Sequence, residues 1–352
     1  MQALGYAAAS STDALVPLRF ERREPRPDDV VLDVLYCGVC HTDLHIAKNH
    51  GGYTNYPVVP GHEIIGRVTR VGSEVTRFKV GDTVGVGCMV DSCQHCNPCL
   101  AGYEQHCQAG PVFTYNGTDR HDHTRTFGGY SNTLVVSDKF VLSIPNGLDP
   151  AGAAPLLCAG ITTWEPLHQW KVGPGSQVAV VGLGGLGHMA LKLAKALGAE
   201  VTLLTRSPNK ELDARRLGAN HVVLSTDASQ MASVAGRFDL IVDTVPYEHD
   251  VNPYLPTLAL NGTLVLVGYM GPLNEPVSAR ALVFGRKAIA GSFTGGIAAT
   301  QAMLDFCGAH NVVSDVEIIP IQQINAAYER LLKSDVKYRF VIDMSSLAAD
   351  KP

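Results

Sequence analysis

Hydrophobic and polar positions follow a strand-like alternation in the first part of the chain. The segment DDVVLDVLY, residues 28–36, alternates as a half-buried β-strand does. Residues 64–72 and 80–86 are again rich in β-branched residues and are interrupted by glycine. Residues 1 to about 150 are therefore predicted to form a small, barrel-like β domain.

From residue 176 onward, short apolar runs are separated by segments of helical periodicity. The pattern predicts a strand for SQVAVV (176–181), a turn for GLGGLG and a helix for HMALKLAKALGA (188–199). Helical patterns also lie between most of the further strand candidates, which are residues 201–205, 221–224, 238–244, 263–268 and 288–293. This alternation is typical of a doubly wound parallel sheet, so the predicted fold class is α/β. Residues 321–344 read as a helix and then a strand, and we expect them to return to the first domain.

The composition fits a folded protein of two domains. The chain has 352 residues, of which 46% are hydrophobic and 17% are charged. Its 28 basic and 33 acidic residues give a net charge of −5, which argues against nucleic acid or an anionic membrane as the main partner. The N-terminus lacks the pattern of a signal peptide, and no apolar run reaches the roughly 18 residues of a membrane span. We therefore expect a cytoplasmic protein, in which thiols stay reduced.

Four of the nine cysteines fall within the short stretch DSCQHCNPCLAGYEQHC. In a reducing compartment the spacing CxxCxxCx7C favours a metal site over disulfides, and nine cysteines cannot all pair. Four thiolates on one ion give the closed tetrahedral shell of structural zinc, with a redox centre or an iron–sulfur cluster as the alternatives. The predicted ligands are Cys93, Cys96, Cys99 and Cys107.

A glycine-rich turn predicts a dinucleotide site. The GxGxxG pattern lies between a predicted strand and a predicted helix, in the first βαβ unit of the series. In that context Gly182 permits the tight turn, Gly184 lets the backbone approach a pyrophosphate, and Gly187 packs the helix on the strand. A glycine turn that binds no ligand is the alternative. The candidate cofactor-binding set further includes Leu183, Gly185, Leu186, Thr244, Val267, Gly268 and Ser292.

The end of the second strand of this series indicates which nucleotide binds. A site that prefers NAD places Asp or Glu there to bind the ribose hydroxyls, but here the strand VTLLT leads into RSPNK. Hydroxyl and cationic donors for a 2′-phosphate stand there instead, on Thr205, Arg206, Ser207 and Lys210. A solvated surface position is the alternative for Arg206. The missing carboxylate predicts NADP(H) as the cofactor.

Three separated segments suggest a second metal site. They contain Cys40 in CGVCHTDLH, His62 and Glu63 in PGHE, and Cys158 in PLLCAG. A Cys/His/Cys set leaves one coordination position open, which is the arrangement of catalytic zinc. Spacing alone does not bring these segments together, and Cys37 also forms with Cys40 a CxxC pattern that suits a redox pair.

Several motifs resemble those of the zinc-dependent medium-chain alcohol dehydrogenases, and most closely those of the cinnamyl alcohol dehydrogenase branch. They cover essentially the full chain in the family's order and are CGVCHTDLH, VPGHEIIGRVTRVGSEVTRFKVGDTVGVG, DSCQHCNPC, PLLCAGITT and VAVVGLGGLGHMALKLAKALGAEVT. The resemblance implies a GroES-like catalytic domain of residues 1–152 and 293–352, which carries both zinc sites. It also implies an inserted Rossmann domain of residues 153–292, a structural zinc on the four clustered cysteines, and a homodimer.

The same resemblance implies roles for residues at the second metal site. Cys40, His62 and Cys158 match the ligands of the catalytic zinc. Glu63 matches a nearby acidic residue that is sometimes a transient ligand, and Asp43 matches a carboxylate that orients the ligand His62.

Further residues match the substrate side of the family's site. Thr42 and His45 match a proton relay, and Thr42 also contacts the cofactor. Phe113 and Phe293 match positions that line the substrate pocket, with a place in the core as the alternative for each. The loop of residues 116–127 is unlike that of plant enzymes, so no role in lignin formation is inferred.

The implied activity is a zinc-dependent interconversion of aldehydes and primary alcohols with hydride transfer to or from NADP(H). Aromatic substrates such as cinnamyl or benzyl alcohol, and medium aliphatic ones, suit an apolar pocket. An NAD-dependent polyol or sugar-alcohol dehydrogenase on the same scaffold is the alternative. A more remote alternative is a relative without zinc catalysis, which would be expected to lack Cys40, His62 or Cys158; all three are present.

Overall fold

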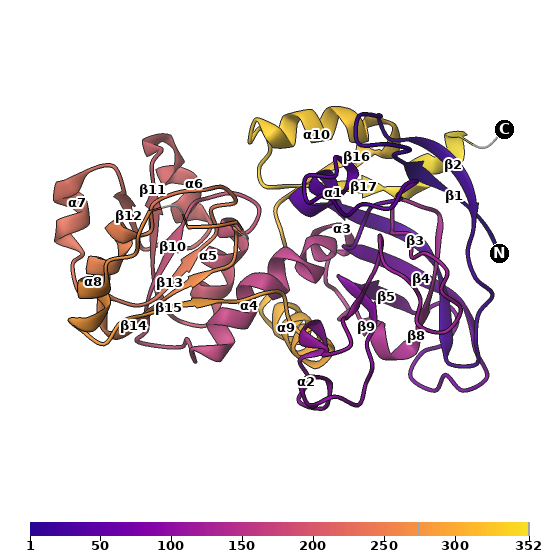
Figure 1. The fold of residues 1–352 in the computed structure, drawn as a ribbon, viewed down its shortest axis with the longest axis horizontal. Helices are drawn as coiled ribbons and strands as arrows, with labels where there is room; N and C mark the ends of the chain where they lie inside the picture. The colour runs from indigo at the N-terminus through magenta and orange to yellow at the C-terminus, as the bar shows by residue number, and fades with distance from the viewer. Residues whose placement is uncertain (270, 274, 351–352) are drawn as a thin grey trace. The chain divides into compact units, whose positions relative to one another are not determined.

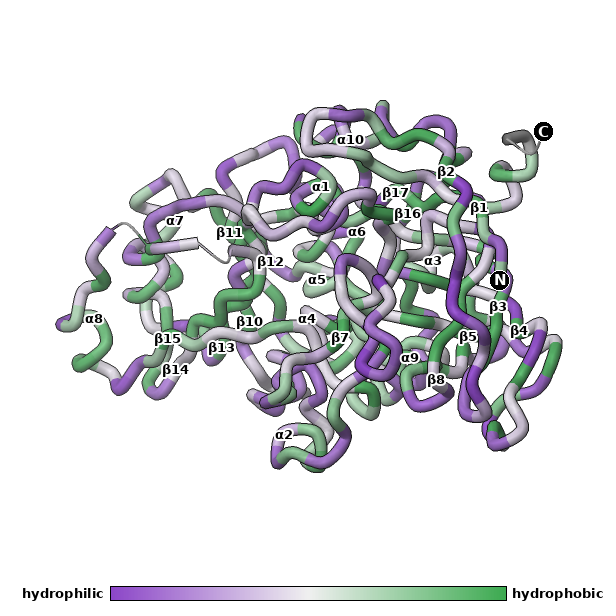
Figure 2. The backbone as a smooth tube through the Cα atoms, turned by 45° about the vertical axis from the view of Figure 1, so that its right-hand side comes forward, coloured by the Kyte–Doolittle hydropathy of each residue, from purple (hydrophilic) through white to green (hydrophobic). Residues whose placement is uncertain are grey.

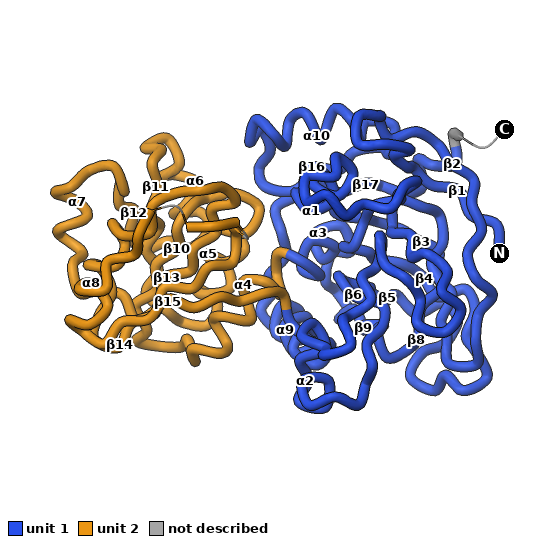
Figure 3. Tube along the Cα trace, viewed as in Figure 1, with its two compact units in different colours: residues 1–158, 295–352 blue, residues 159–294 orange. Residues whose placement is uncertain are grey.

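The computed structural model describes residues 1–269, 271–273 and 275–350. It divides the chain into two compact units, which Figure 3 shows in different colours: unit 1 comprises residues 1–158 and 295–352, and unit 2 comprises residues 159–294. Unit 2 is therefore inserted into unit 1 along the chain. The boundaries predicted from the sequence, after residues 152 and 292, lie a few residues N-terminal to those of the structure.

Unit 1 is built on a mainly antiparallel sheet with the strand order β16-β17-β3-β4-β5-β9, and β8 also pairs with β3 (Figure 1). Its strands are β3 (Asp29–Val39), β4 (Ile64–Val71), β5 (Thr83–Val86), β8 (Thr133–Ser137), β9 (Leu142–Ser143), β16 (Val316–Pro320) and β17 (Arg339–Asp343). The long strand β3 is central, because it pairs with β4, β8 and β17. β16 and β17 come from the C-terminal segment, and β17 pairs with both β16 and β3.

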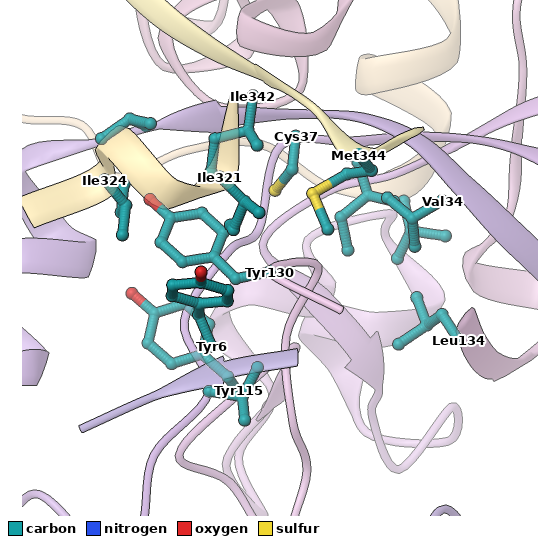
Figure 4. Close-up of a cluster of buried hydrophobic side chains, with 14 of the residues drawn as sticks. Tyr6, Val34, Cys37, Tyr115, Tyr130, Leu134, Ile321, Ile324, Ile342 and Met344 are labelled. Atoms are coloured by element: carbon teal, nitrogen blue, oxygen red, sulfur yellow. The ribbon is translucent and has the colours of Figure 1, made fainter. Parts of the chain in front are cut away.

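A hydrophobic core packs against this sheet. Val30, Leu32 and Val34 of β3 all face the core, which explains the alternation of the sequence there. Burying each such side chain contributes about 1.5–3 kcal/mol relative to leaving it exposed. Figure 4 shows part of this core, in which Tyr130 and Cys37 lie among aliphatic side chains from both ends of the chain.

Unit 2 contains a wholly parallel sheet with the strand order β12-β11-β10-β13-β14-β15. Its strands are β10 (Gln177–Val181), β11 (Glu200–Thr205), β12 (His221–Leu224), β13 (Phe238–Asp243), β14 (Leu258–Leu266) and β15 (Ala288–Gly291). The apolar colour of β10 and β13 in Figure 2 reflects burial on both faces. When these strands are numbered by their order along the chain, their order across the sheet is 3-2-1-4-5-6. This is the Rossmann order, and it confirms the predicted α/β class.

The remaining elements connect and cover these sheets. The helices are α1 (His41–Ala47), α2 (Asn97–Leu100), α3 (Pro150–Ala153), α4 (Ala159–Gln169), α5 (Gly187–Ala196), α6 (Glu211–Arg216), α7 (Ala228–Ser233), α8 (Ala279–Val283), α9 (Ile297–His310) and α10 (Ile324–Leu332). The short strands β6 (Met89–Asp91) and β7 (Val112–Phe113) pair with each other, as do β1 (Gln2–Ala7) and β2 (Val16–Glu21), a hairpin that the sequence patterns did not predict. Among the residues that the structure describes, no helix combines the length and apolarity needed to cross a bilayer.

Two candidate metal centres and a dinucleotide site

The candidate metal site that combines cysteine, histidine and glutamate begins at the junction of β3 and α1. Cys40 is the N-cap of α1, and Asp43 Oδ2 accepts a hydrogen bond of 2.9 Å from the Cys40 amide. Gly38 lies against the carboxylate of Glu63, so that a Cβ atom at this position would collide with it. Glycine in the CGVC motif therefore leaves the space that the Glu63 side chain occupies.

The three separated segments of the predicted catalytic site converge in unit 1. The Sγ atoms of Cys40 and Cys158 lie 3.9 Å apart, and ligand atoms of these residues, His62 and Glu63 all lie within 4.8 Å of one another. Two thiolates on one tetrahedral zinc, each about 2.3 Å from the ion, would be about 3.8 Å apart. The spacing and the donor set therefore fit zinc.

Asp43 is the buried carboxylate that organises this cluster. It accepts hydrogen bonds from the Cys40 amide at 2.9 Å, the Gly61 amide at 3.0 Å and the Tyr130 hydroxyl at 3.2 Å. Its Oδ1 also lies 3.0 Å from His62 Nδ1. Because Nδ1 is taken up by Asp43, Nε2 is the nitrogen of His62 left for a metal. Burial disfavours the imidazolium of His62, but the charge of Asp43 outweighs this and raises the pKa of His62 well above its usual value.

Glu63 and Arg339 form a buried ion pair beside the cluster. Burial raises the pKa of Glu63 to about 8, although the charge of Arg339 acts in the opposite direction. Glu63 Oε2 is buried and has no hydrogen-bond partner, a condition that costs about 1–3 kcal/mol for a polar atom. A bound cation would satisfy this oxygen, which is a second observation that fits the site to a metal.

The two thiols of the cluster influence each other. Their mutual hydrogen bond lowers the pKa of Cys40 well below its usual value, and the charge of Arg339 acts in the same direction. The same hydrogen bond raises the pKa of Cys158, and the neighbouring Cys88 raises it further. One thiolate is thus readily formed, and a metal that binds both sulfurs would release the second proton.

Thr42 and His45 lie at one side of this cluster. Thr42 Oγ1 is 3.7 Å from the Sγ atom of Cys40. Both side chains are exposed, whereas Asp43, Leu44 and Ile46 of the same helix are buried. Residues three apart are neighbours on a helix, so Thr42 and His45 share the exposed face of α1.

The four-cysteine segment gathers its sulfurs into one cluster. Cys99 Sγ lies 3.9 Å from Cys93 Sγ and 3.4 Å from Cys96 Sγ, and all four sulfurs, that of Cys107 included, lie within 4.8 Å of one another. These separations suit four ligands on one tetrahedral ion. The segment brings together the four residues predicted to hold structural zinc.

Hydrogen-bond donors surround this cluster. Three of the sulfurs each accept a hydrogen bond of 3.3–3.4 Å from a backbone amide. The donors are the amides of Cys93, Cys96 and Gln108. A hydrogen bond from the backbone of His95 lowers the pKa of Cys93 to about 6. The guanidinium of Arg120 lies 3.9 Å from Cys107 Sγ. Donors directed at sulfur stabilise thiolates, so this environment suits a tetrathiolate metal site better than two disulfides.

The glycine loop of unit 2 has the geometry of a dinucleotide-binding turn. Gly182 has φ +86°, which favours glycine, and Gly184 faces open space with no atom within 4 Å of a Cβ placed there. A Cβ at Gly187, the first residue of α5, would collide with the carbonyl of Gly182. These are the three tasks predicted for the loop: a tight turn, a close approach to a ligand, and close packing of helix on strand.

The end of β11 carries the predicted 2′-phosphate residues. Arg206 Nη2 lies 2.7 Å from the hydroxyl of Tyr247, and the guanidinium also lies over the Tyr247 ring, 5.6 Å from its centroid. Lys210 Nζ donates a hydrogen bond of 2.8 Å to the Leu183 carbonyl in the glycine loop. Thr205 is buried, and its Oγ1 accepts a hydrogen bond from the Ser207 amide. Arg206 is thus the cation of this group that remains exposed to a ligand.

The other predicted cofactor residues follow the carboxyl ends of the strands. Thr244 follows β13, Val267 and Gly268 follow β14, and Ser292 follows β15. Ligands of open α/β sheets bind at these ends, close to the switch point between β10 and β13. The predicted pocket residues Phe113 and Phe293 are 40% and 41% exposed, which excludes a core position for both. Because they belong to different units, their place in one pocket stays a prediction.

Sequence reasoning missed several residues of these sites. Arg339 and Tyr130 carried no sequence signal, because they are distant in the chain from Glu63 and Asp43. Cys88 also matches no sequence motif; it is half-buried, and its Sγ lies 3.7 Å from the carbonyl of Leu157, next to Cys158. Cys37 lies in the hydrophobic core, where burial raises the pKa of its thiol, and this disfavours the redox-pair reading.

A Rossmann sheet with an open glycine loop, a closed four-thiol cluster and a mixed Cys/His/Cys cluster together define a zinc-dependent dehydrogenase of a nicotinamide dinucleotide. Comparison with known proteins identifies the family. Residues 26–146 match the model of the alcohol dehydrogenase GroES-like domain, and residues 185–309 match that of the zinc-binding dehydrogenases. The chain belongs to this family of zinc-binding alcohol dehydrogenases.

Relatives with different names share about half of the residues. An NADP-dependent alcohol dehydrogenase C of Mycolicibacterium smegmatis is 53% identical, covering 97% of this chain and 98% of its own length. A probable mannitol dehydrogenase of Medicago sativa is 50% identical, covering 98% and 96%. The solved structure of a cinnamyl alcohol dehydrogenase of Sorghum bicolor is 49% identical, covers 98% of both chains and superposes with a TM-score of 0.94. The predicted resemblance to the cinnamyl alcohol dehydrogenase branch is confirmed.

Replacing Cys96 by alanine tests the structural cluster. We expect the variant to contain about one zinc less per chain and to melt at least about 5 °C lower, because a closed zinc site orders the loop that binds it. Elemental analysis and thermal unfolding measure the two effects. Cys307→Ala is the matched control, since Cys307 is buried in α9 outside both clusters. A Cys96→Ala protein with the metal content of the control would contradict the assignment.

Proposed function

We propose that this protein is a zinc-dependent dehydrogenase that interconverts aldehydes and primary alcohols with NADP(H). Its substrates would include aromatic alcohols such as cinnamyl and benzyl alcohol and medium aliphatic ones. The observation that carries this proposal is the convergence of two thiols with an imidazole whose other nitrogen is held by a buried carboxylate. Such a carboxylate–histidine pair fixes the tautomer and orientation of a metal ligand.

The residues of unit 1 would place the metal and the substrate. Cys40, His62 and Cys158 would hold a catalytic zinc, with Glu63 beside them. When bound, the zinc supplies a Lewis acid for the substrate oxygen, and NADP(H) gives or takes the hydride. The chain itself orients His62 through Asp43.

Thr42 and His45 would move the proton of the reaction. The alcohol loses its hydroxyl proton during oxidation, and the aldehyde gains one during reduction. The Thr42 hydroxyl lies beside Cys40, and His45 shares its exposed face of α1. A hydroxyl followed by an imidazole offers the proton a route from the site toward solvent.

The cofactor would be NADP(H) rather than NAD(H). The glycine loop offers backbone amides at the N-terminus of α5 for the pyrophosphate. No carboxylate follows β11, and Arg206 is exposed there as a charged partner for a 2′-phosphate. The M. smegmatis relative, named as NADP-dependent, supports this choice.

Oxidation of polyols is the second candidate function. The name of the M. sativa relative, a probable mannitol dehydrogenase, favours it. The exposed aromatic side chains of Phe113 and Phe293 argue for apolar substrates instead, if both line the pocket. The two candidates differ in substrate and in cofactor, so one assay separates them.

We further propose that the enzyme works in the cytoplasm as a homodimer. Metal-binding thiols need a reducing compartment, and eight of the nine cysteines lie in or beside these clusters or in the core of unit 1. Dimer formation rests on the family resemblance.

A panel of alcohols and aldehydes, assayed with both cofactors, tests the proposed function. We expect benzaldehyde and cinnamaldehyde to be reduced with NADPH, at a kcat/KM at least about 10-fold above that with NADH, given the charge-assisted bonds to the 2′-phosphate. Purified active enzyme should contain two zinc ions per chain if both clusters are loaded. A preference for mannitol or sorbitol with NAD would establish the second candidate instead.

Replacement of Cys158 by serine tests the catalytic cluster. Losing one thiolate ligand should lower kcat by about 100-fold or more, because a Lewis acid contributes several kcal/mol to such a reaction. Circular dichroism should show an unchanged fold. Cys37→Ala is the control, since Cys37 lies in the core; it should keep its turnover, whereas a redox pair of Cys37 and Cys40 would lose it. A wild-type rate in Cys158→Ser would remove Cys158 from the ligand set.

Arg206→Ala tests the phosphate site. The KM for NADPH should rise about 10-fold while that for NADH changes little, because only NADPH carries the group that Arg206 would bind. Tyr247→Phe should have a smaller effect in the same direction, since the Tyr247 hydroxyl holds the guanidinium. Arg215→Ala, on the surface of α6 and paired with Glu211, is the control. Equal effects on both cofactors would show that Arg206 does not read the 2′-phosphate.

A further inference from the structure

His249 and Asp243 form a hydrogen-bonded pair at the carboxyl edge of the parallel sheet of unit 2. Asp243 is the last residue of β13 and is buried, and its Oδ2 lies 2.7 Å from Nε2 of the half-buried His249. The other ring nitrogen of His249, Nδ1, lies 2.9 Å from the carbonyl oxygen of Tyr247. The imidazole therefore joins the end of a buried strand to the exposed segment that follows it.

Both ring nitrogens of His249 face hydrogen-bond acceptors. A carbonyl oxygen only accepts hydrogen bonds, and so does an ionised carboxylate. Asp243 Oδ1 accepts a hydrogen bond of 3.1 Å from the Val245 amide, and such a donor favours the ionised form. Each nitrogen of His249 must then carry a proton, which makes the ring an imidazolium cation. In agreement with this, the hydrogen bond to Asp243 raises the pKa of His249, although burial acts in the opposite direction.

The imidazolium supports the exposed arginine that follows β11. Its Nδ1 holds the backbone of Tyr247, and Arg206 Nη2 donates a hydrogen bond of 2.7 Å to the hydroxyl of the same tyrosine. The guanidinium also lies over the Tyr247 ring. β11 and β13 flank β10 in the sheet, and β10 leads into the glycine loop (Figure 1). His249 and Arg206 thus follow the two strands on either side of the dinucleotide-binding turn.

The other titratable groups around His249 leave its charge in place. The Tyr254 ring is centred 6.3 Å from that of His249, and burial raises the pKa of Tyr254 to about 12, so this phenol stays neutral. Glu248 and Asp250 flank His249 in the chain, but both are exposed, and Asp250 accepts hydrogen bonds from Asn252.

Two cations gathered at one edge of the sheet indicate an anionic ligand. The charge of Arg206 opposes the protonation of His249, and such repulsion is relieved when an anion binds near both cations. Asp243 compensates one of the two charges and leaves the other. The 2′-phosphate of NADP(H) carries nearly two negative charges above about pH 6, as phosphate monoesters do.

We propose that protonated His249 is a positioning residue for cofactor selectivity, which holds Tyr247 and through it Arg206 for the 2′-phosphate of NADP(H). This inference rests on the proposed function, in which Arg206 binds that phosphate. A neutral imidazole donates only one hydrogen bond, and the bond to the Asp243 carboxylate is the stronger one. Loss of the proton therefore releases the Tyr247 carbonyl and weakens the preference for NADPH over NADH.

The direction of the pKa shift fixes the pH dependence. Selectivity is complete below the pKa of His249 and is lost as the pH rises through it, and the raised pKa places this loss above the usual histidine value of about 6.5. Arg206 keeps its charge throughout this range. Lys210 is the other cation that could titrate on the alkaline side, because burial lowers its pKa.

Equilibrium binding of NADPH and NADH to the zinc-loaded protein, from about pH 6.5 to pH 9.5, tests this role. Nicotinamide fluorescence follows binding, and the ratio of the two dissociation constants isolates the 2′-phosphate, since the cofactors share every other group. In the wild type we expect the preference for NADPH to fall by about 3- to 10-fold with rising pH, the effect of one hydrogen bond. In His249→Gln the preference should be low already at pH 6.5, and this alkaline fall should be absent.

Two further variants sharpen the assignment. His221→Gln is the matched control, because His221 pairs with Glu200 at 2.8 Å where β12 and β11 begin, at the opposite edge of the sheet. It should keep the wild-type preference and its pH dependence. Asp243→Asn removes the charge that stabilises the imidazolium, so the midpoint of the fall should move to lower pH. An unchanged midpoint in Asp243→Asn would show that His249 is not the titrating group.

The outcomes separate this role from the proposed function. A wild-type preference at every pH in His249→Gln, or an unchanged alkaline fall that then belongs to Lys210, would overturn the role of His249 alone. Equal weakening of NADPH and NADH binding in that variant would do the same, because it would mean a general loss of structure. If the wild-type protein bound both cofactors equally at every pH, the proposed role of Arg206 would be wrong as well.

Discussion

The carboxylate of Asp43 is the interaction on which the mixed metal cluster depends. A carboxylate withdrawn from water is costly unless its oxygens are fully engaged, and here donors from α1, from the Gly61–His62 segment and from Tyr130 engage them. The first turn of α1, the orientation of His62 and the loop that carries Gly61 are therefore anchored to one group. Because Cys40 is the N-cap of the same helix, a metal ligand and a helix start share this anchor.

The charges around Asp43 explain why the cluster suits a cation. Asp43, Glu63 and the two thiols are acidic groups in one mostly buried region, and Arg339 is the cation paired with them. Burial raises the pKa of Glu63 to about 8, while Arg339 and the hydrogen bond from Cys158 favour the thiolate of Cys40. A divalent ion would offset the cost of burying these ionised carboxyl and thiol groups, because it stabilises the anionic form of each of them. Arg339 supports the cluster without replacing such an ion, since it reaches Glu63 and leaves one of its oxygens unpartnered.

Local sequence patterns predicted those parts of the protein that are local in the chain. The four-cysteine cluster and the glycine loop each lie within a short segment, so spacing carries their geometry. The strands of unit 2 were predictable because strands buried on both faces are continuous apolar runs. Arg339 lies 276 residues from Glu63, and no periodicity connects two such positions. That Cys40, His62 and Cys158 form one site could be predicted only from the resemblance to a family. The pairing of His45 with His50 depends on the left-handed backbone conformation of one residue, Asn49.

The division of the chain gives these sites a further property. Cys158 is the last residue of the first segment of unit 1, and Ala159 begins α4 in unit 2. The second crossing, between Thr294 and Gly295, follows shortly after Ser292 and Phe293, which are predicted to contact the cofactor and the substrate. Each of the two covalent connections between the units therefore lies within two residues of a position that the sequence predicts to bind the metal, the cofactor or the substrate.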